Sequence, residues 1–322
     1  MRKMIMTAVW IGALLLTGCS AEGSASDSGK YQIVCTNFPE YDWTMQLIKG
    51  HEDVFEVTYL LKNGVDIHNY QPTAADMAKI AGCDLFLYVG GESEHWVPDA
   101  LSEAVNPEMH TIRLLDAVNA LEEETVEGME AEAEEEEGEE EAPEYDEHVW
   151  LSVRNAMQFC DVISGQLGAI DPEHAADYTN NKTNYCDALM ALDADFTAVH
   201  DSMAEPTLIV ADRFPFRYFV EDYGYPYYAA FAGCSAETEA SFETIAFLAQ
   251  KADELGASTI FTIEGGNTDI ADAVIASTKD KNQTIARLNS LQSVTETQMA
   301  EGVTYLSLMQ ENLNVLKEAA ER

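Results

Sequence analysis

The sequence predicts an α/β fold: two Rossmann-like lobes with parallel sheets, joined by one long linker helix. In both halves of the chain, short apolar and β-branched runs alternate with stretches of helical spacing, a pattern typical of βαβ units. Between the halves lies one long helical pattern, 171–203. A helix of about 30 residues spans about 45 Å, which is long enough to cross from one lobe to the other.

The first 30 residues predict export and a lipid anchor. Residues 1–18 combine a basic start with an apolar run that is shorter than the roughly 20 residues of a membrane-spanning helix, as in a signal peptide. Leu16-Thr17-Gly18-Cys19 is similar to a bacterial lipobox, which makes Cys19 the lipidated first residue; the alternative is a chance cysteine after an ordinary signal peptide. Residues 19–30 form a flexible tether. The mature protein is therefore expected to be extracytoplasmic, anchored to the outer face of the cell membrane.

The N-terminal lobe is expected to span 31–170. Within it, the stretch 122–147 is more than half acidic, contains no basic residue and lacks a periodic apolar face, so it is predicted to be a disordered loop. The expected strands are 32–36, 55–60, 84–89 and 110–114, and the expected helices are 41–49, 73–81 and 153–167.

The linker helix and the C-terminal lobe follow. Asp171-Pro172 predicts the start of the linker, with Asp as N-cap and Pro at the first helical position. The linker is expected to end near Met203, and the C-terminal lobe to span 204–322. The expected strands of this lobe are 207–211 and 259–263, and its expected helices are 217–223, 242–255, 269–277 and 304–320.

The composition is strongly acidic, with 58 acidic against 17 basic residues and a net charge of −41. Such a surface repels nucleic acid and anionic lipid and favours cations in general. The acidic stretch 122–147 is either a low-affinity cation collector or a solubilising insert. Beyond Cys19 the cysteines are odd in number and form no CxxC pair, so mostly buried thiols are expected and disulfide pairing stays open.

The most informative motif lies within 64–97. His68 occupies a turn-rich segment, and Thr73 with Asp76 has the spacing of a helix capping box. This stretch resembles the segment that carries the first histidine ligand in the metal-binding lipoproteins of ABC importers, the zinc and manganese solute-binding family. The resemblance extends over nearly all of the mature chain, and it implies two lobes whose rigid linker limits hinge opening.

A second motif, Asp146-Glu147-His148-Val149-Trp150, follows the acidic stretch. It is similar to the D-x-H-V-W-like segment that carries the second ligand in the family, so the resemblance implies that His148 binds metal. Taken alone, His148 would be a surface histidine, because short motifs match often by chance. Neutral imidazoles suit zinc, copper and nickel.

The third ligand position departs from the family pattern. The family has a His or Glu five residues before a tyrosine, and Arg213, which cannot bind a cation, holds that place before Tyr218. Asp212 is the neighbouring candidate if the backbone shifts by one residue. Alternatively, Asp212 only pairs with Arg213 or Arg217, and both interpretations stay open.

The fourth family position is an aspartate, and here it is occupied by Asn289, whose amide is a weak zinc ligand. Glu264 is the stronger candidate, because it follows the strand 259–263 at the end where α/β sheets bind ligands. A hinge or helix N-terminal glutamate is the alternative. Cys234 is a candidate soft ligand for which a structural role is expected.

These features predict a binding module that captures a divalent transition metal and passes it to the permease of an ABC importer. The expected cargo is Zn2+, with Mn2+ as the alternative. The expected ligands are His68, His148 and Glu264, with Asp212 or water completing the shell. There is no P-loop, nucleophile elbow or H-E-x-x-H motif, so no enzyme is expected. The protein is expected to be a monomer and to have no nucleic-acid partner. The alternatives are a surface adhesin or partner-binding lipoprotein with a degenerate metal site, and a metallohydrolase with Glu264 as base.

Overall fold

The computed structural model describes residues 29–130, 144–235 and 239–322. The predicted signal peptide, Cys19 and nearly all of the tether lie outside these residues. Among the helices that are described, none combines the length and the apolar character needed to cross a membrane.

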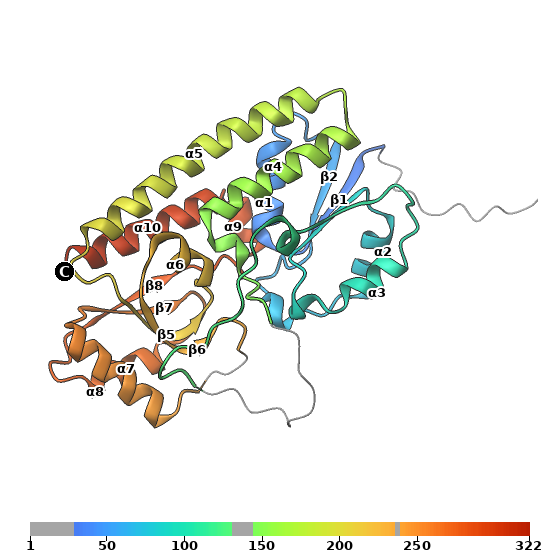
Figure 1. Cartoon of the computed structure of the whole chain (residues 1–322). Helices are drawn as coiled ribbons and strands as arrows, with labels where there is room; N and C mark the ends of the chain where they lie inside the picture. Colours follow the sequence, from blue (N-terminus) through green and yellow to red (C-terminus); the bar gives the residue numbers. More distant parts are fainter. Residues whose placement is uncertain (1–28, 131–143, 236–238) are drawn as a thin grey trace, which may run out of the picture.

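Both lobes contain a four-stranded sheet in which every strand pairing is parallel, as the sequence predicts (Figure 1). The order is β2-β1-β3-β4 in the N-terminal lobe and β6-β5-β7-β8 in the C-terminal lobe. The order reverses at β1/β3 and at β5/β7, and ligands of such sheets bind at the carboxyl ends of the strands beside these points. The strands are β1 Tyr31–Cys35, β2 Phe55–Tyr59, β3 Leu85–Tyr88, β4 His110–Arg113, β5 Leu208–Phe214, β6 Tyr227–Ala232, β7 Thr259–Ile263 and β8 Thr284–Leu288.

Helices connect and cover the strands. The α-helices are α1 Phe38–Leu47, α2 Ala74–Gly82, α3 Val97–Ser102, α4 Val153–Ile170, α5 Ala175–Ser202, α6 Arg217–Tyr223, α7 Phe242–Leu255, α8 Asp269–Ser277, α9 Glu296–Ala300 and α10 Tyr305–Ala320. Short 3-10 helices lie at Ile67–Asn69 (η1), Glu92–Glu94 (η2), Leu114–Ala117 (η3) and Val149–Leu151 (η4).

Each sheet is buried on both faces, because successive side chains of a strand point to opposite sides. In the N-terminal lobe, Val34 of β1 belongs to a cluster with residues of α2 and α3, whereas Ile33 belongs to the main core with residues of α1 and α4. In the C-terminal lobe, Ile209 packs with residues of α7 and α8, and Val210 belongs to the main core with residues of α10.

The main core continues from one lobe into the other. The Trp150 indole donates to the Ser290 carbonyl at 2.8 Å, and the Tyr305 hydroxyl donates to the Trp150 carbonyl at 2.8 Å. Helix α5 runs along both lobes and packs against α10 (Figure 1). The lobes are thus joined by buried contacts as well as by the linker helix.

Two strands, the two short helices α3 and α9 and the start of the linker differ from the prediction. Strands β6 and β8 were not predicted; β6, Tyr-Tyr-Ala-Ala-Phe-Ala, lacks β-branched residues and directly follows Pro226. The linker helix begins at Ala175 instead of Pro172. The Asp171 carboxylate accepts hydrogen bonds from the His174 ring and the Tyr178 hydroxyl, so it holds a turn between α4 and α5 rather than capping the linker.

The acidic stretch 122–147 is described only at its two ends, and 131–143 lie outside the described residues. Both ends have defined contacts, which corrects the expectation of a disordered loop for these parts. Glu122 and Tyr145 form an antiparallel bridge, and the Glu130 carboxylate accepts from the backbone N–H of Ser241 at 2.8 Å. Glu147, at the end of the stretch, is only 2% exposed.

Candidate metal centre

His68 lies in η1, beside the cavity between the lobes. The Asp66 side chain caps this short helix by accepting from the His68 backbone N–H at 3.1 Å, and Ile67 anchors it in the core. The predicted capping box of Thr73 and Asp76 starts α2 directly behind it. The histidine is therefore held on a short segment fixed at both ends.

His148 immediately precedes η4, whose residues Val149–Leu151 are fully buried. Asp146 accepts from the His148 backbone N–H at 2.8 Å and lies 3.2 Å from Nδ1 of the same residue. An aspartate two residues before each histidine thus positions its backbone. The repeated Asp-x-His spacing is visible in the sequence, and it could have identified Asp66 and Asp146 as the residues that support the two histidines.

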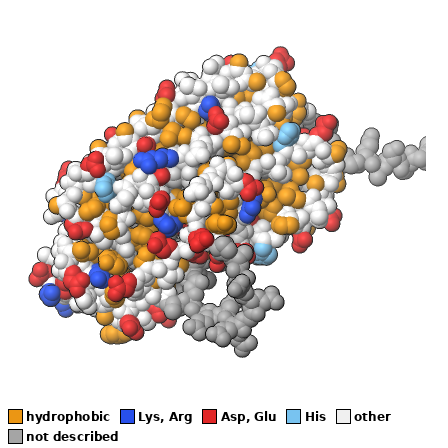
Figure 2. Space-filling model, viewed as in Figure 1, with side chains coloured by type: hydrophobic (Ala, Val, Ile, Leu, Met, Phe, Trp, Pro, Cys, Tyr) orange, Lys and Arg blue, Asp and Glu red, His pale blue; other side chains and the backbone are white. Residues whose placement is uncertain are grey.

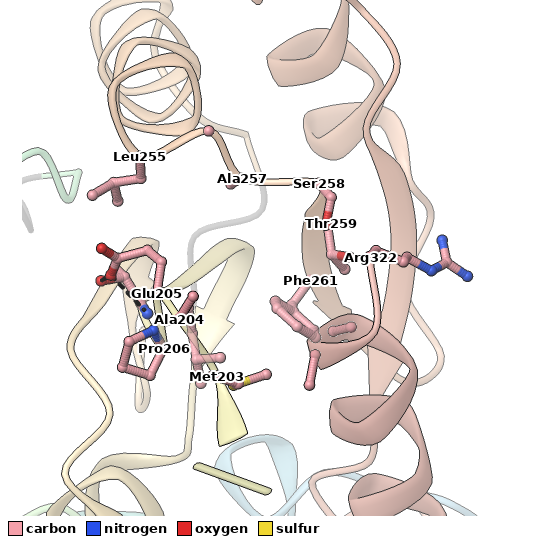
Figure 3. A pocket seen from close by; sticks show the side chains of 15 residues that line it. Met203, Ala204, Glu205, Pro206, Leu255, Ala257, Ser258, Thr259, Phe261 and Arg322 are labelled. Atoms are coloured by element: carbon pink, nitrogen blue, oxygen red, sulfur yellow. Dashed lines mark hydrogen bonds between the residues drawn. The ribbon is translucent and has the colours of Figure 1, made fainter. Parts of the chain in front are cut away.

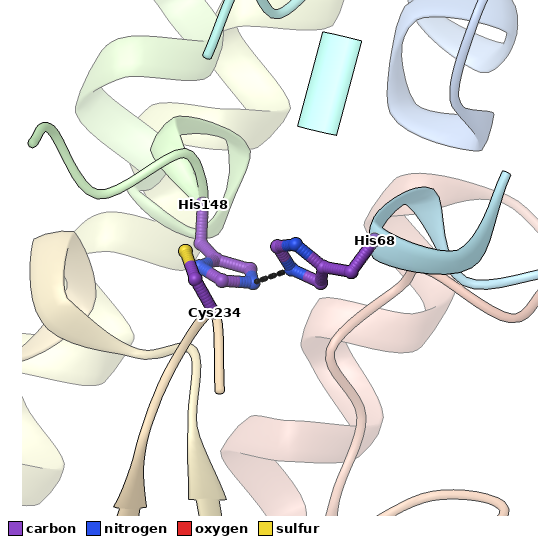
Figure 4. A group of neighbouring side chains, drawn as sticks. All are labelled: His68, His148 and Cys234. Atoms are coloured by element: carbon purple, nitrogen blue, oxygen red, sulfur yellow. Dashed lines mark hydrogen bonds between the residues drawn. The ribbon is translucent and has the colours of Figure 1, made fainter. Parts of the chain in front are cut away.

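The two imidazoles face each other, with 3.2 Å between the Nε2 atoms (Figure 4). Nδ1 of His68 lies 2.6 Å from Ser93 Oγ, and Nδ1 of His148 lies next to Asp146. When both Nδ1 atoms donate to these oxygens, both Nε2 lone pairs point into the shared space. Two lone pairs at this distance need a proton or a metal cation between them, and histidine ligands of metals are commonly oriented in this way.

In the absence of metal, the proton of this pair belongs to His148. Burial lowers the pKa of His68 to about 3, helped by the nearby His148. Burial also opposes the charge of His148, but attraction to Asp146 and the hydrogen bond to it outweigh burial and raise its pKa. Nε2–H of His148 then donates to neutral His68, and a metal ion must displace this proton.

Cys234 is the third residue of the cluster. In the described part of the chain, one group of three potential metal ligands has all its donor atoms within 4.8 Å of one another: His68, His148 and Cys234. Cys234 follows the carboxyl end of β6, and its backbone N–H donates to Glu123 Oε1 at 3.0 Å. It comes from the C-terminal lobe, whereas both histidines come from the N-terminal lobe.

Glu264 and Asp212 line the same cavity but do not join that group. Both oxygens of Glu264 accept hydrogen bonds from Ser290, one from its hydroxyl at 2.6 Å and one from its backbone N–H at 2.7 Å. Asp212 accepts from the backbone N–H groups of Arg213 and Ile263. Burial raises the pKa of both carboxyl groups.

The register of β5 shifts between Val210 and Arg213, as at a β-bulge, which re-aims side chains. The Asp212 carboxylate bonds to backbone N–H groups, and the Arg213 guanidinium crosses the cavity to Asp66 at 2.8 Å. A positive side chain thus lies where the resembled family places a ligand. Asn289 is used elsewhere, because its Oδ1 accepts from the Leu291 backbone N–H.

The acidic stretch contributes buried residues beside the histidines. One oxygen of Glu147 accepts from the Ser93 backbone N–H at 2.7 Å, and the other lies 3.7 Å from His68 Nδ1. Gly91 permits this arrangement, because a Cβ there would overlap the Glu147 side chain. Burial raises the pKa of Glu147, although its bonds to Ser93 oppose the change.

A cavity of about 640 Å³ lies between the lobes, at the carboxyl ends of β5 and β7, and its lining includes His68, Glu147, Asp212, Cys234 and Glu264. A second cavity of about 310 Å³ lies at the opposite, amino ends of these strands (Figure 3). Its charged lining residues are Glu205 and Arg322, and Glu205 is bonded to Thr207. On the visible outer surface, Asp and Glu side chains greatly outnumber Lys and Arg (Figure 2). The cavity between the lobes is therefore the one with the chemistry of a cation site.

Comparison with known proteins gives one family. The model of the ZnuA family, described as the periplasmic component A of the zinc-uptake complex, matches residues 33–319. The high-affinity zinc uptake system protein ZnuA of Bacillus subtilis is 30% identical, over 96% of this chain and 97% of that protein. The zinc-binding lipoprotein AdcA of Streptococcus pneumoniae is also 30% identical over the whole chain, but the chain spans only 62% of the length of AdcA.

Solved structures agree with this result. The metal-dependent lipoprotein YcdH of Bacillus subtilis superposes with a TM-score of 0.73 at 25% identity, covering 90% of this chain and 99% of that one. The Zn(II)-bound ZnuA-like domain of Streptococcus pneumoniae AdcA gives a TM-score of 0.71 at 26% identity, covering 91% of this chain and all of that domain. The similarity therefore includes both lobes.

Proposed function

We propose that this chain, which belongs to the ZnuA family of periplasmic components of zinc-uptake complexes, captures Zn2+ outside the cytoplasm and delivers it to the permease of an ABC importer. The family expected from the two histidine motifs is thereby confirmed. Its members are transport components, so the chain has a binding role and not an enzymatic one.

One observation carries the proposal: the imidazoles of His148, which is buried, and His68, which is partly buried, have their Nε2 atoms 3.2 Å apart beside a cavity between two lobes. Donors in a tetrahedral zinc site are about 3.3–3.8 Å apart, given bonds of roughly 2.0–2.3 Å. His68 and His148 therefore need little rearrangement to share an ion. Affinity favours zinc over manganese at nitrogen-containing sites, and Mn2+ is the alternative cargo.

The C-terminal lobe supplies the remaining donors. Glu264 and Asp212 line the cavity opposite the histidines, and their carboxylates attract the incoming cation even while they are hydrogen-bonded. The two lobes share a continuous core, so we expect small movements on zinc binding rather than wide hinge opening. We further propose a monomer attached to the membrane through a lipid on Cys19.

The test is zinc titration by calorimetry of the chain from Ser20 onward, which excludes the Cys19 thiol. The expected result is one site that binds zinc with a submicromolar Kd. His68→Ala and His148→Ala are each expected to weaken it by at least about 100-fold, since removal of a residue that merely orients a ligand already costs 10–100-fold. His200→Ala, on the partly exposed part of α5, is the matched control and should bind like the native chain.

Absence of saturable zinc or manganese binding in the native chain would overturn the proposal. Full metal retention in both histidine variants would leave a metal-binding protein with a different site. An adhesin with a degenerate site predicts the first outcome, so the titration separates the two functions.

A further inference from the structure

We infer that the Cys234 thiolate is the third protein ligand of the zinc ion, so that the site has two nitrogens and one sulfur rather than two nitrogens and a carboxylate. This inference rests on the proposed function and names the donor from the C-terminal lobe. Neither Glu264 nor Asp212 holds that position in it.

The first argument is proximity. The donor atoms of His68, His148 and Cys234 lie within 4.8 Å of one another, and the Cys234 side chain lies beside the His148 ring while His68 faces that ring (Figure 4). A tetrahedral zinc site holds such donors about 3.3–3.8 Å apart. An approach of about 1 Å is therefore enough to complete a three-ligand set, with the fourth position open to water.

The second argument is competition for the carboxylates. Glu264 has both oxygens bonded to Ser290, and Asp212 has both oxygens bonded to backbone N–H groups. Either residue must give up these bonds to reach the histidines, and the buried N–H groups left behind would be unsatisfied. Cys234 is anchored by its backbone N–H, which donates to Glu123. Its sulfur is in contact with the backbone N–H of Glu147, and because sulfur is a weak acceptor, moving this side chain costs less than moving either carboxylate.

The third argument is the backbone that carries the thiol. Gly233, the first residue after β6, lies so close to His148 that a Cβ at this position would lie 2.9 Å from the Phe214 carbonyl oxygen and 3.1 Å from the His148 ring. Only glycine allows β6 to approach the ring at this distance. The approach delivers the next residue, Cys234, to the edge of the metal centre.

The charge and proton balance of the site is consistent with a thiolate. Burial raises the pKa of the Cys234 thiol, with Asp146 and Glu123 adding to the effect, so without metal the sulfur is protonated. On zinc binding the S–H bond breaks, the Zn–S bond forms and the proton leaves to the buffer, because a coordinating thiol is deprotonated outright. The +1 charge of a Zn2+–thiolate pair would then lie beside the carboxyl groups of Asp146 and Glu147, which favour a cation.

The test uses Co2+ as a spectroscopic probe in the chain from Ser20 onward. A cobalt–thiolate bond gives an intense charge-transfer absorption in the near ultraviolet that nitrogen and oxygen ligands do not give. We expect this band in the native chain and in Cys186→Ser, a control at a half-buried cysteine on α5. It should vanish in Cys234→Ser.

Zinc affinity is the second readout. Cys234→Ser should weaken zinc binding by about tenfold or more, whereas Glu264→Gln and Asp212→Asn, which remove a nearby negative charge but no ligand, should each weaken it by less than Cys234→Ser does. Cobalt bound by the native chain without the charge-transfer band would overturn the inference and leave the proposed function intact. Failure of the native chain to bind either metal would overturn the proposed function. The native cobalt spectrum needs no variant, so poor folding of Cys234→Ser cannot obscure the result.

Discussion

The Arg213 guanidinium of the C-terminal lobe donates to the Asp66 carboxylate of the N-terminal lobe across the cavity between the lobes, with 2.8 Å between Nη2 and Oδ2. Asp66 also caps the helix that presents His68. The ion pair therefore connects the two lobes at the same point where it places a positive charge beside the cation site.

Arg213→Gln is predicted to tighten zinc binding by about tenfold, or about 1.4 kcal/mol. The substitution removes a charge that repels the incoming cation and frees Asp66 to attract it, and such effects are largest in partly buried sites. Competition of the protein with a coloured chelator measures the change. Arg154→Gln, which alters the net charge equally but pairs with Asp193 on α5, should leave the Kd unchanged. Weaker binding in Arg213→Gln would show that the ion pair holds the lobes in the binding geometry.

Zinc binding is predicted to weaken as the pH falls through the raised pKa of His148. Below that pKa the His148 imidazole carries a proton on the nitrogen that must bind metal, and attraction to Asp146 stabilises this proton against burial. His68 holds no competing proton until about pH 3. Calorimetry in buffers of different ionisation enthalpy should reveal the release of up to two protons on zinc binding near neutral pH, one from His148 and one from the Cys234 thiol. Asp146→Asn should diminish the His148 share and leave the thiol proton in place. A constant Kd down to about pH 5 would contradict the assignment of the proton to His148.

Replacing every glutamate between 131 and 143 by glutamine is predicted to leave the tight zinc site unchanged and to reduce the number of weakly bound ions. These glutamates lie outside the described residues, whereas Glu123 and Glu130 contact Cys234 and Ser241. Equilibrium dialysis at low ionic strength counts both classes of ion. A companion variant, Glu123→Ala, should instead weaken the tight site, because it removes the oxygen that accepts from the Cys234 backbone N–H. Loss of the tight site in the first variant would mean that this segment supplies ligands.

Asp42→Asn is predicted to stabilise the fold above pH 6 by up to about 3 kcal/mol, from a pKa change of about two units. Burial raises the pKa of Asp42 to about 6 from 3.8, although bonds from Tyr305 and Gln46 oppose the change. Between these values the native state binds more protons than the unfolded state, so stability is lost as the pH rises through 6. The amide oxygen of asparagine can still accept from the Tyr305 N–H.

Urea unfolding near pH 4 and near pH 8 measures this effect, since the variant and the native chain should be equally stable at about pH 4. Asp53→Asn, at an exposed position, controls for the loss of one negative charge. If Asp42→Asn and the native chain were equally stable at both pH values, the ionised Asp42 carboxylate would not destabilise the native fold.

Most helices and strands follow from local patterns in the sequence. The ranges expected for α6, α7, β7 and α8 match the structure residue for residue, because each combines a cap or turn residue with a clear apolar period. Strand β6 was not predicted, because its alanine and aromatic residues form a strand only through pairing with β5. Propensity for a strand is largely a matter of such packing.

The residues of the candidate metal centre could be predicted from the sequence only in part. His68 and His148 were identified from short motifs, and the structure brings them together although they are 80 positions apart in the chain. Glu264 and Asp212 were expected as metal ligands, which stays a prediction. Both line the cavity between the lobes, but the hydrogen bonds that occupy their oxygens could not be foreseen. Those bonds come from Ser290 and Ile263, and both belong to neighbouring strands or loops.

The sequence by itself determined the fold class, the family and the two histidines, because these depend on local periodicity and on short motifs whose residues are adjacent in the chain. Only the tertiary structure decided that Arg213 pairs with Asp66 and that Cys234 lies beside the histidines. These relationships depend on a bulge in β5 and on the end of an unpredicted strand, β6. Shifts of one residue reverse the direction of a strand side chain, and such shifts are set by the packing of the two lobes, not by local sequence.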